Sequence, residues 1–154
     1  MKIGIPKEAA DSRVAMVPSV MKKLGDDKVT FLVEKGAGVA ASLGDSTYSE
    51  VATITDRQTV IKDSDIVVSI APLPEADQAA LKEGALMISM FQPYNDESVV
   101  PALKEKGRQA VSMDMIPRTT LAQSMDILSS MAAVAGYKAV LTACLLYTSP
   151  SPRD

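Results

Sequence analysis

Four polar side chains near the start of the last predicted helix have the types and spacing of a binding site. Gln123, Asp126 and Ser129 recur at three-residue steps, so they share a helix face or the turn that leads into it. Arg118 precedes them in a loop and could reach a phosphate or a carboxamide. An amide, a cation and hydroxyls suit recognition of a ribose and a carboxamide better than they suit breaking a bond.

The same residues also have a purely structural interpretation. Thr120-x-x-Gln123 is a capping box, in which side chains satisfy backbone N–H groups at the start of a helix. Asp126 in a first helical turn complements the helix dipole. Spacing alone leaves both interpretations open.

Two other segments are weaker candidates. Lys7, Glu8 and Arg13 follow the first predicted strand, at the sheet edge where ligands bind in open α/β folds, although a solvated loop that pairs with itself is the favoured interpretation. Residues 36–41, GAGVAA, match the phosphate-binding pattern G-x-G-x-x-A. Because Gly44-Asp45 interrupts the helix that such a site needs, we interpret this segment as a surface turn.

The composition excludes several kinds of chemistry. The chain has no histidine and a single cysteine, Cys144, so it can form neither a zinc site of the usual donors nor a Ser–His or Cys–His nucleophile. One cysteine also excludes an intramolecular disulfide and suits a reducing compartment. The net charge of −3, with no basic stripe, argues against nucleic acid as a partner.

The pattern along the chain predicts the scaffold for these residues. Short β-branched runs alternate with helical segments, which indicates an α/β fold: an open, mostly parallel, flavodoxin- or Rossmann-like sheet with helices on both faces and a long C-terminal helix. Strands are expected at residues 2–5, 29–33, 53–54, 66–70, 86–90 and 109–113, and residues 36–46 are expected to be loop. Helices are expected at residues 18–24, 56–62 (with Asp56 as cap), 75–82, 96–106 and 123–143.

The chain divides into three expected parts. Residues 1–122 form one domain, residues 123–144 a long connecting helix, and residues 145–154, LLYTSPSPRD, a disordered tail that looks non-native. The amino terminus lacks the apolar region of a signal peptide. The uncharged runs at 127–137 and 139–152 are shorter than the roughly 18 apolar residues of a membrane span. We therefore expect a soluble, cytoplasmic chain without membrane insertion of its own.

Several stretches of the sequence resemble one known family. They are KIGIPKE, SRVAMVPSVMKKL, APL, and the long segment SMDMIPRTTLAQSMDILSSMAAVAGYKAVLTA. They look like the amino-terminal domain shared by the alpha subunit of proton-translocating NAD(P) transhydrogenase and by alanine dehydrogenase, over about residues 1–143.

The resemblance implies hydride transfer between NAD(H) and NADP(H), coupled to proton translocation by partner subunits. It assigns binding of the nicotinamide end of NAD(H) to Arg118, Gln123, Asp126, Leu128 and Ser129, with Gln123 and Asp126 at the reacting centre. It implies no metal. The partners would be NADP(H)-binding and membrane subunits and a second copy of the chain, at the cytoplasmic face of the inner membrane. In the family an NAD-binding domain follows this region, so the fragment alone would be inactive.

An alanine-dehydrogenase-like enzyme is the alternative. That branch uses a Lys and a His near its substrate, whereas here the Lys position falls in the Ile-Ala-Pro of residues 70–72 and histidine is absent. Arg13 matches the substrate arginine of that branch. Direct hydride transfer between two nicotinamide rings needs positioning and no acid or base, so it fits the chain better. A non-catalytic flavodoxin-like module, with a helix that serves only dimerisation, is the third interpretation.

Overall fold

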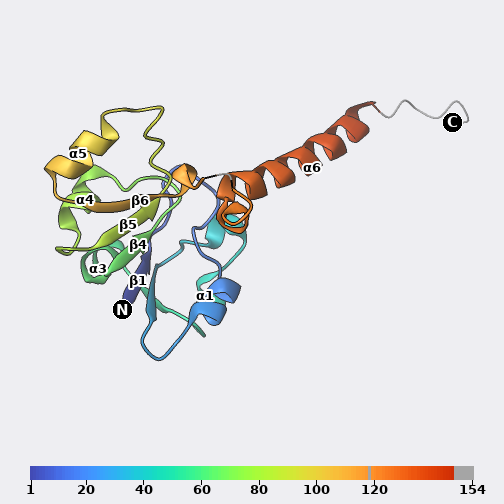
Figure 1. The fold of residues 1–154 in the computed structure, drawn as a ribbon. Coiled ribbons are helices and arrows are strands. Elements are labelled where there is room, and N and C mark those ends of the chain that lie inside the picture. Colours follow the sequence, from blue (N-terminus) through green and yellow to red (C-terminus); the bar gives the residue numbers. More distant parts are fainter. Residues whose placement is uncertain (118, 148–154) are drawn as a thin grey trace, which may run out of the picture. The chain divides into compact units, whose positions relative to one another are not determined.

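Six short strands form one parallel sheet in a computed structural model that describes residues 1–117 and 119–147 (Figure 1). The strands are β1 (Lys2–Ile5), β2 (Thr30–Glu34), β3 (Thr53–Thr55), β4 (Ile66–Val68), β5 (Leu86–Ser89) and β6 (Gln109–Ser112). Their order is β3-β2-β1-β4-β5-β6, with β1 paired to β2 on one side and to β4 on the other. This is the order of a doubly wound sheet, in which the winding reverses between β1 and β4. The expected fold class is confirmed.

Five helices of residues 1–113 alternate with the strands and cover both faces of this sheet. They are α1 (Pro18–Leu24), α2 (Asp45–Tyr48), α3 (Arg57–Asp63), α4 (Glu75–Ala80) and α5 (Val99–Glu105). A further helix, α6 (Ile127–Tyr147), comes after the last strand in the sequence. Single 3-10 turns are formed by η1 (Val39–Ala41), η2 (Met113–Met115) and η3 (Gln123–Met125). Figure 1 shows α3, α4 and α5 on one side of the sheet and α1 on the other, as parallel strands with right-handed crossovers require.

Two clusters of aliphatic side chains form the core. Ile3 and Ile5 of β1 belong to the first cluster, together with Phe31 and Val33 of β2. The second cluster is built around Val67 and Met87, with further members from α3 and from the segments between the elements (Ile61, Leu73, Leu81, Ala85 and Phe91). Alternate residues of a strand point to opposite faces, so the buried strands supply both clusters.

Gly4 marks the closest approach of a helix to the sheet. A Cβ at this position would overlap the Oγ of Ser64 and would lie 3.0 Å from Cγ1 of Val60. Ser64 is fully buried, and its hydroxyl donates to the carbonyl oxygen of Val60 at 2.6 Å. Glycine is therefore required in the middle of β1 by packing against the end of α3.

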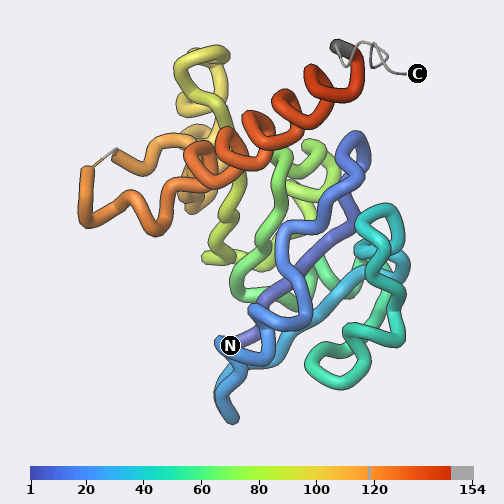
Figure 2. Tube along the Cα trace, turned by 90° about the vertical axis from the view of Figure 1, so that its right-hand side faces the viewer, coloured from blue at the N-terminus to red at the C-terminus, as the bar shows by residue number. Residues whose placement is uncertain are grey.

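The contacts divide the chain into two units, Met1–Met113 and Asp114–Asp154. The expected division into residues 1–122, 123–144 and 145–154 stays a prediction. In the second unit, Figure 2 shows a loop, drawn in orange, that leads into α6, drawn in red. The helix expected from residue 123 begins later, because Asp126 adopts an extended conformation (ψ 101°) between η3 and α6. It also continues through Leu145 and Leu146 to Tyr147, so it runs into the segment expected to be a tail. Residues 148–154 lie outside the described residues.

α6 is apolar around its whole circumference and exposed. Of the described residues, Ile127–Leu146 form one helical stretch with the length and composition of a membrane span, at a mean hydropathy of 1.4. The sequence analysis counted uncharged runs and therefore divided this stretch at Lys138, whereas a helix of this length and composition can include a lysine. Helices that are apolar all round are found in bilayers and in the interiors of soluble proteins alike.

Candidate functional site

Asp126 organises the start of α6. Its Oδ1 accepts hydrogen bonds from the backbone N–H of Leu128 at 3.0 Å and of Ser129 at 3.3 Å, which is the geometry of an N-cap. Its Oδ2 accepts from the Ser129 hydroxyl at 2.5 Å. Of the two interpretations left open by the spacing, a capping box of Thr120 and Gln123 is not what starts α6: Asp126, in an extended conformation just before the helix, accepts from its first N–H groups.

A polar pocket of about 210 Å³ lies at this corner. It is lined by Thr119, Thr120, Gln123, Asp126 and Ser129. The structure therefore brings together the three residues singled out by their spacing, and it adds two threonine hydroxyls. Leu128, the remaining described residue of the set, follows Asp126 and is 39% exposed. Arg118 lies outside the described residues.

The groups that line this pocket are hydroxyls, one amide and one carboxylate. Ser129 donates its hydroxyl proton to Asp126, which leaves its oxygen lone pairs available to accept. Gln123, in the η3 turn, carries an amide that both donates and accepts. Asp126 is only 5% exposed, and its carboxylate is committed to the helix start. The pocket can hold an amide or a sugar hydroxyl in a fixed orientation.

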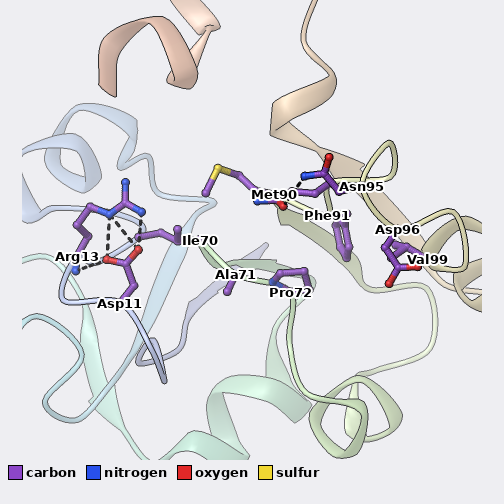
Figure 3. Close-up of a pocket in the computed structure, with 11 residues that line it drawn as sticks. Asp11, Arg13, Ile70, Ala71, Pro72, Met90, Phe91, Asn95, Asp96 and Val99 are labelled. Atoms are coloured by element: carbon purple, nitrogen blue, oxygen red, sulfur yellow. Dashed lines mark hydrogen bonds and ion pairs between the residues drawn. The ribbon is translucent and has the colours of Figure 1, made fainter. Parts of the chain in front are cut away.

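A second cleft, of about 500 Å³, lies in the first unit at the carboxyl ends of β1, β4 and β5 (Figure 3). It is lined by Asp11, Arg13, Ile70, Ala71, Pro72, Met90, Phe91, Gln92, Asn95, Asp96 and Val99. In Figure 3, Asp11 and Arg13 lie on one side of the cleft and Asn95 and Asp96 on the other. Neither lysine nor histidine is among these lining residues.

Arg13 is paired within its own loop. Its Nε donates to Oδ1 of Asp11 at 2.9 Å, its Nη2 donates to Oδ2, and its backbone N–H donates to Oδ1 at 2.8 Å. The side-chain hydrogen bond from Arg13, with the backbone hydrogen bond in second place, lowers the pKa of Asp11 to about 2. The same hydrogen bond raises the pKa of Arg13.

Glu8 fixes the loop across the point where the winding of the sheet reverses. Its carboxylate accepts from the backbone N–H of Ile70 at 2.6 Å and of Ala71 at 3.2 Å, just after β4. The backbone N–H of Lys7 donates to Glu34 at 2.8 Å. The interpretation of residues 7–13 as a charged loop that pairs with itself and its neighbours agrees with these contacts.

Arg57 joins four segments beside this loop. Its Nη1 donates to Glu34 at 2.8 Å and to the carbonyl oxygen of Lys7 at 3.0 Å. Its Nε and Nη2 donate to Asp77 at 2.9 and 2.7 Å. Arg57 was not singled out from the sequence, because its acceptors are distant in the chain and share no motif with it. Its role is to hold the ends of β1 and β2 against α3 and α4.

Residues 36–41 form a turn, as expected. Gly36 has a positive φ of 76° and Val39–Ala41 is a single 3-10 turn, so no helix is present to receive a phosphate. A Cβ on Gly38 would lie 2.6 Å from the carbonyl oxygen of Leu43 and 2.8 Å from the ring of Tyr48. The glycines are explained by the turn and by packing. Within the part of the chain that the structure describes, no group of three His, Cys, Asp or Glu side chains is placed to hold a metal ion.

The chain is similar to proteins of known families. The family model "Alanine dehydrogenase/PNT, N-terminal domain" matches residues 4–135. The NAD(P) transhydrogenase subunit alpha of Cereibacter sphaeroides is 39% identical over 150 residues, which cover 93% of this chain and 28% of that protein. An alanine dehydrogenase of Staphylococcus haemolyticus is 30% identical over 139 residues, covering 88% of this chain and 37% of that protein.

The fold of the chain is also that of a solved relative. The crystal structure of transhydrogenase from Sinorhizobium meliloti matches it with a TM-score of 0.87 and 31% sequence identity, covering 97% of this chain and 46% of that one. The chain therefore spans less than half the length of each of these relatives.

Proposed function

The chain belongs to the family of alanine dehydrogenase/PNT N-terminal domains, and we propose that the protein containing it is a transhydrogenase that passes hydride between NAD(H) and NADP(H). In this proposal the chain supplies one wall of the pocket for the nicotinamide end of NAD(H). NADP(H) is held by a partner domain, and membrane subunits couple the reaction to proton translocation. The protein then lies at the cytoplasmic face of the membrane as a homodimer.

One observation carries the proposal: Gln123, Asp126 and Ser129 line a single polar pocket at the start of α6. Its groups fit the amide and ribose ends of a nicotinamide nucleotide, because they are hydroxyls, an amide and a committed carboxylate rather than acids or bases. NAD(H), when bound, supplies or receives the hydride. The residues of this chain would hold and orient it.

Each side chain has a distinct task in this proposal. Asp126 fixes the first turn of α6 and points the Ser129 oxygen toward the pocket, so that Ser129 accepts a hydrogen bond from a carboxamide N–H. Gln123 donates and accepts at the opening, where it bridges the two nucleotides. Arg118 would contribute the positive charge, and Leu128 an apolar contact. Direct transfer depends on the separation and angle of the two rings, so small displacements slow it strongly.

The alternative, an amino-acid dehydrogenase, rests on Arg13 in the cleft at the edge of the sheet. It is less favoured. Oxidative deamination must move protons between amine, imine and water, and a cleft lined by Asp11, Asn95 and Asp96 offers no lysine or histidine for that work. The pairing of Arg13 with Asp11 also occupies the one cationic group among the lining residues.

The test is the variant Gln123→Ala in the full-length protein. We expect hydride transfer between NADH and an NADP analogue to slow by about 10- to 100-fold, because the Gln123 amide positions the two nicotinamide rings. The affinity for NADH should change only a few-fold, because this amide contributes little to holding the nucleotide. The matched control is Gln58→Ala, the same substitution at an exposed position of α3. Unchanged transfer in Gln123→Ala, or deamination of L-alanine by the unsubstituted protein, would refute the proposal.

A further inference from the structure

The cleft at the carboxyl ends of β1 and β4 contains two sets of hydrogen-bond donors that can bind anions. One is the guanidinium of Arg13, and the other is the pair of backbone N–H groups of Ile70 and Ala71 after β4. In doubly wound sheets, ligands bind at this reversal point. Carboxylates and phosphates are commonly bound by bidentate arginine side chains and by adjacent backbone N–H groups.

Both sets of donors already form hydrogen bonds with carboxylates of the loop between β1 and α1. Asp11 meets the Nε and Nη2 edge of Arg13 side-on, and Glu8 accepts from Ile70 and Ala71. Glu8 ties the loop to the segment after β4 through these backbone hydrogen bonds. Figure 3 shows the Asp11–Arg13 pair on one side of the cleft, beside Ile70. The side chains of Arg13 and Asp11 are 43% and 24% exposed, so the pair remains open to solvent and to small solutes.

We propose that Asp11 is a built-in ligand of Arg13 that closes this cleft to small anions, so that the fold's ordinary ligand position is filled by the chain itself. The guanidinium edge that would fork onto a carboxylate is taken by the carboxylate of Asp11. A free carboxylate that enters the cleft must displace Asp11 or approach while its negative charge stays nearby. This cleft is lined by other residues than the pocket at Gln123, and the proposal does not depend on the function proposed above.

Asp96 provides a matched comparison within the same cleft. It lines the cleft as Asp11 does, but its Oδ1 accepts from the backbone N–H of Ser98 at 3.0 Å and from the Ser98 hydroxyl at 2.5 Å. Replacing Asp96 by Asn removes the same charge from the cleft without releasing Arg13. Comparing Asp11→Asn with Asp96→Asn therefore distinguishes the effect of the Asp11–Arg13 pair from the effect of the cleft's negative charge in general.

The experiment measures binding of propionate, a simple monocarboxylate, to the full-length protein by saturation-transfer difference NMR. We expect Asp11→Asn and Asp11→Ala to bind propionate about tenfold more tightly than the unsubstituted protein, because a unit charge beside the binding position is gone. The gain should be below threefold in Asp96→Asn and absent when Arg13→Gln is added to Asp11→Asn. Circular dichroism establishes that each variant is folded, and either Asp11 variant suffices.

Three results would overturn the proposal. The first is equal affinity in the unsubstituted protein and the Asp11 variants. The second is an equal gain in Asp96→Asn, which would assign the effect to net charge. The third is a gain that persists without Arg13.

Discussion

Asp126 gives the start of α6 its geometry through three hydrogen bonds from the helix to one carboxylate. We expect Asp126→Ala to lower the free energy of unfolding by about 1 kcal/mol or more, since an N-cap is lost. Asn is also a good cap, so Asp126→Asn should restore most of this stability. The measurement is urea unfolding followed by circular dichroism.

Thr142→Ala is the control for this effect, because Thr142 only donates back to the carbonyl oxygen of Lys138 within the same helix. Its expected change is a small stabilisation, about 0.5 kcal/mol or less, because alanine has the higher helix propensity. An Asp126→Ala variant as stable as Thr142→Ala would show that the carboxylate does not cap the helix.

Asp11 gives the chain a dependence of stability on pH. Its pKa in the folded protein is about 2, below the ordinary 3.8, so its contribution is present above about pH 4 and is lost as the pH falls through 2. Because Arg13 is 43% exposed, solvent screens the pair, and the contribution is about 0.5 kcal/mol at neutral pH.

The measurement is the difference in unfolding free energy between the unsubstituted protein and Asp11→Asn, at pH 7 and at pH 2.5. We expect the difference to shrink at the lower pH. Asp27→Asn, on an exposed loop, is the control. A difference that stays constant or grows on acidification contradicts the assignment.

Single residues were predictable from the sequence where the signal was local. The three-residue spacing of Gln123, Asp126 and Ser129 predicted that they lie together, and the structure places them around one pocket; their role in binding stays a prediction. The capping role of Asp126 could not be read from spacing, because its extended conformation depends on the loop that precedes it. The role of Asp11 beside Arg13 was missed, although the Asp-x-Arg spacing is a local signal that could have indicated it.

Among the elements, β1 and α3 approach each other closely at Gly4. We expect Gly4→Ala to destabilise the fold by about 1–3 kcal/mol, since the new methyl group meets the buried Ser64 and Val60. Removing the Ser64 hydroxyl in Gly4→Ala/Ser64→Ala should recover part of this loss. A double-mutant cycle by chemical denaturation measures the coupling.

The matched control is Gly136→Ala in α6, where an added Cβ meets nothing within 4 Å. This change should instead stabilise the helix by about 0.5–1 kcal/mol. If both substitutions had the same small effect, the close approach of α3 to β1 would be disproved.

Elements were predictable in type and order but less so at their ends. β4 and β5 end at Val68 and Ser89, before their predicted ends at residues 70 and 90; there the hydroxyls of Ser69 and Ser89 donate to the loop carbonyl oxygens of Ala71 and Ile70. α5 begins at Val99 instead of residue 96, since Asp96 caps a turn through Ser98. The short helix α2 and the turn η1 lie in a segment expected to be loop, where glycine content concealed them.

At the scale of the whole molecule, the exposed α6 and the length of the relatives bear on cofactor binding. We expect residues 1–154 alone to bind NADH too weakly for calorimetry to detect, because in our proposal they form one wall of the nicotinamide pocket. The full-length protein should bind it measurably under the same conditions. A micromolar dissociation constant for the isolated chain would contradict this division of the site.

The position of β1 has a consequence for biosynthesis. Translation delivers β1 before both of its neighbours in the sheet, β2 and β4. One of its two edges therefore stays unpaired until residues 66–68, which form β4, have emerged from the ribosomal exit tunnel. Until then the nascent chain presents an apolar ribbon, and this is the interval in which a chaperone has most to protect.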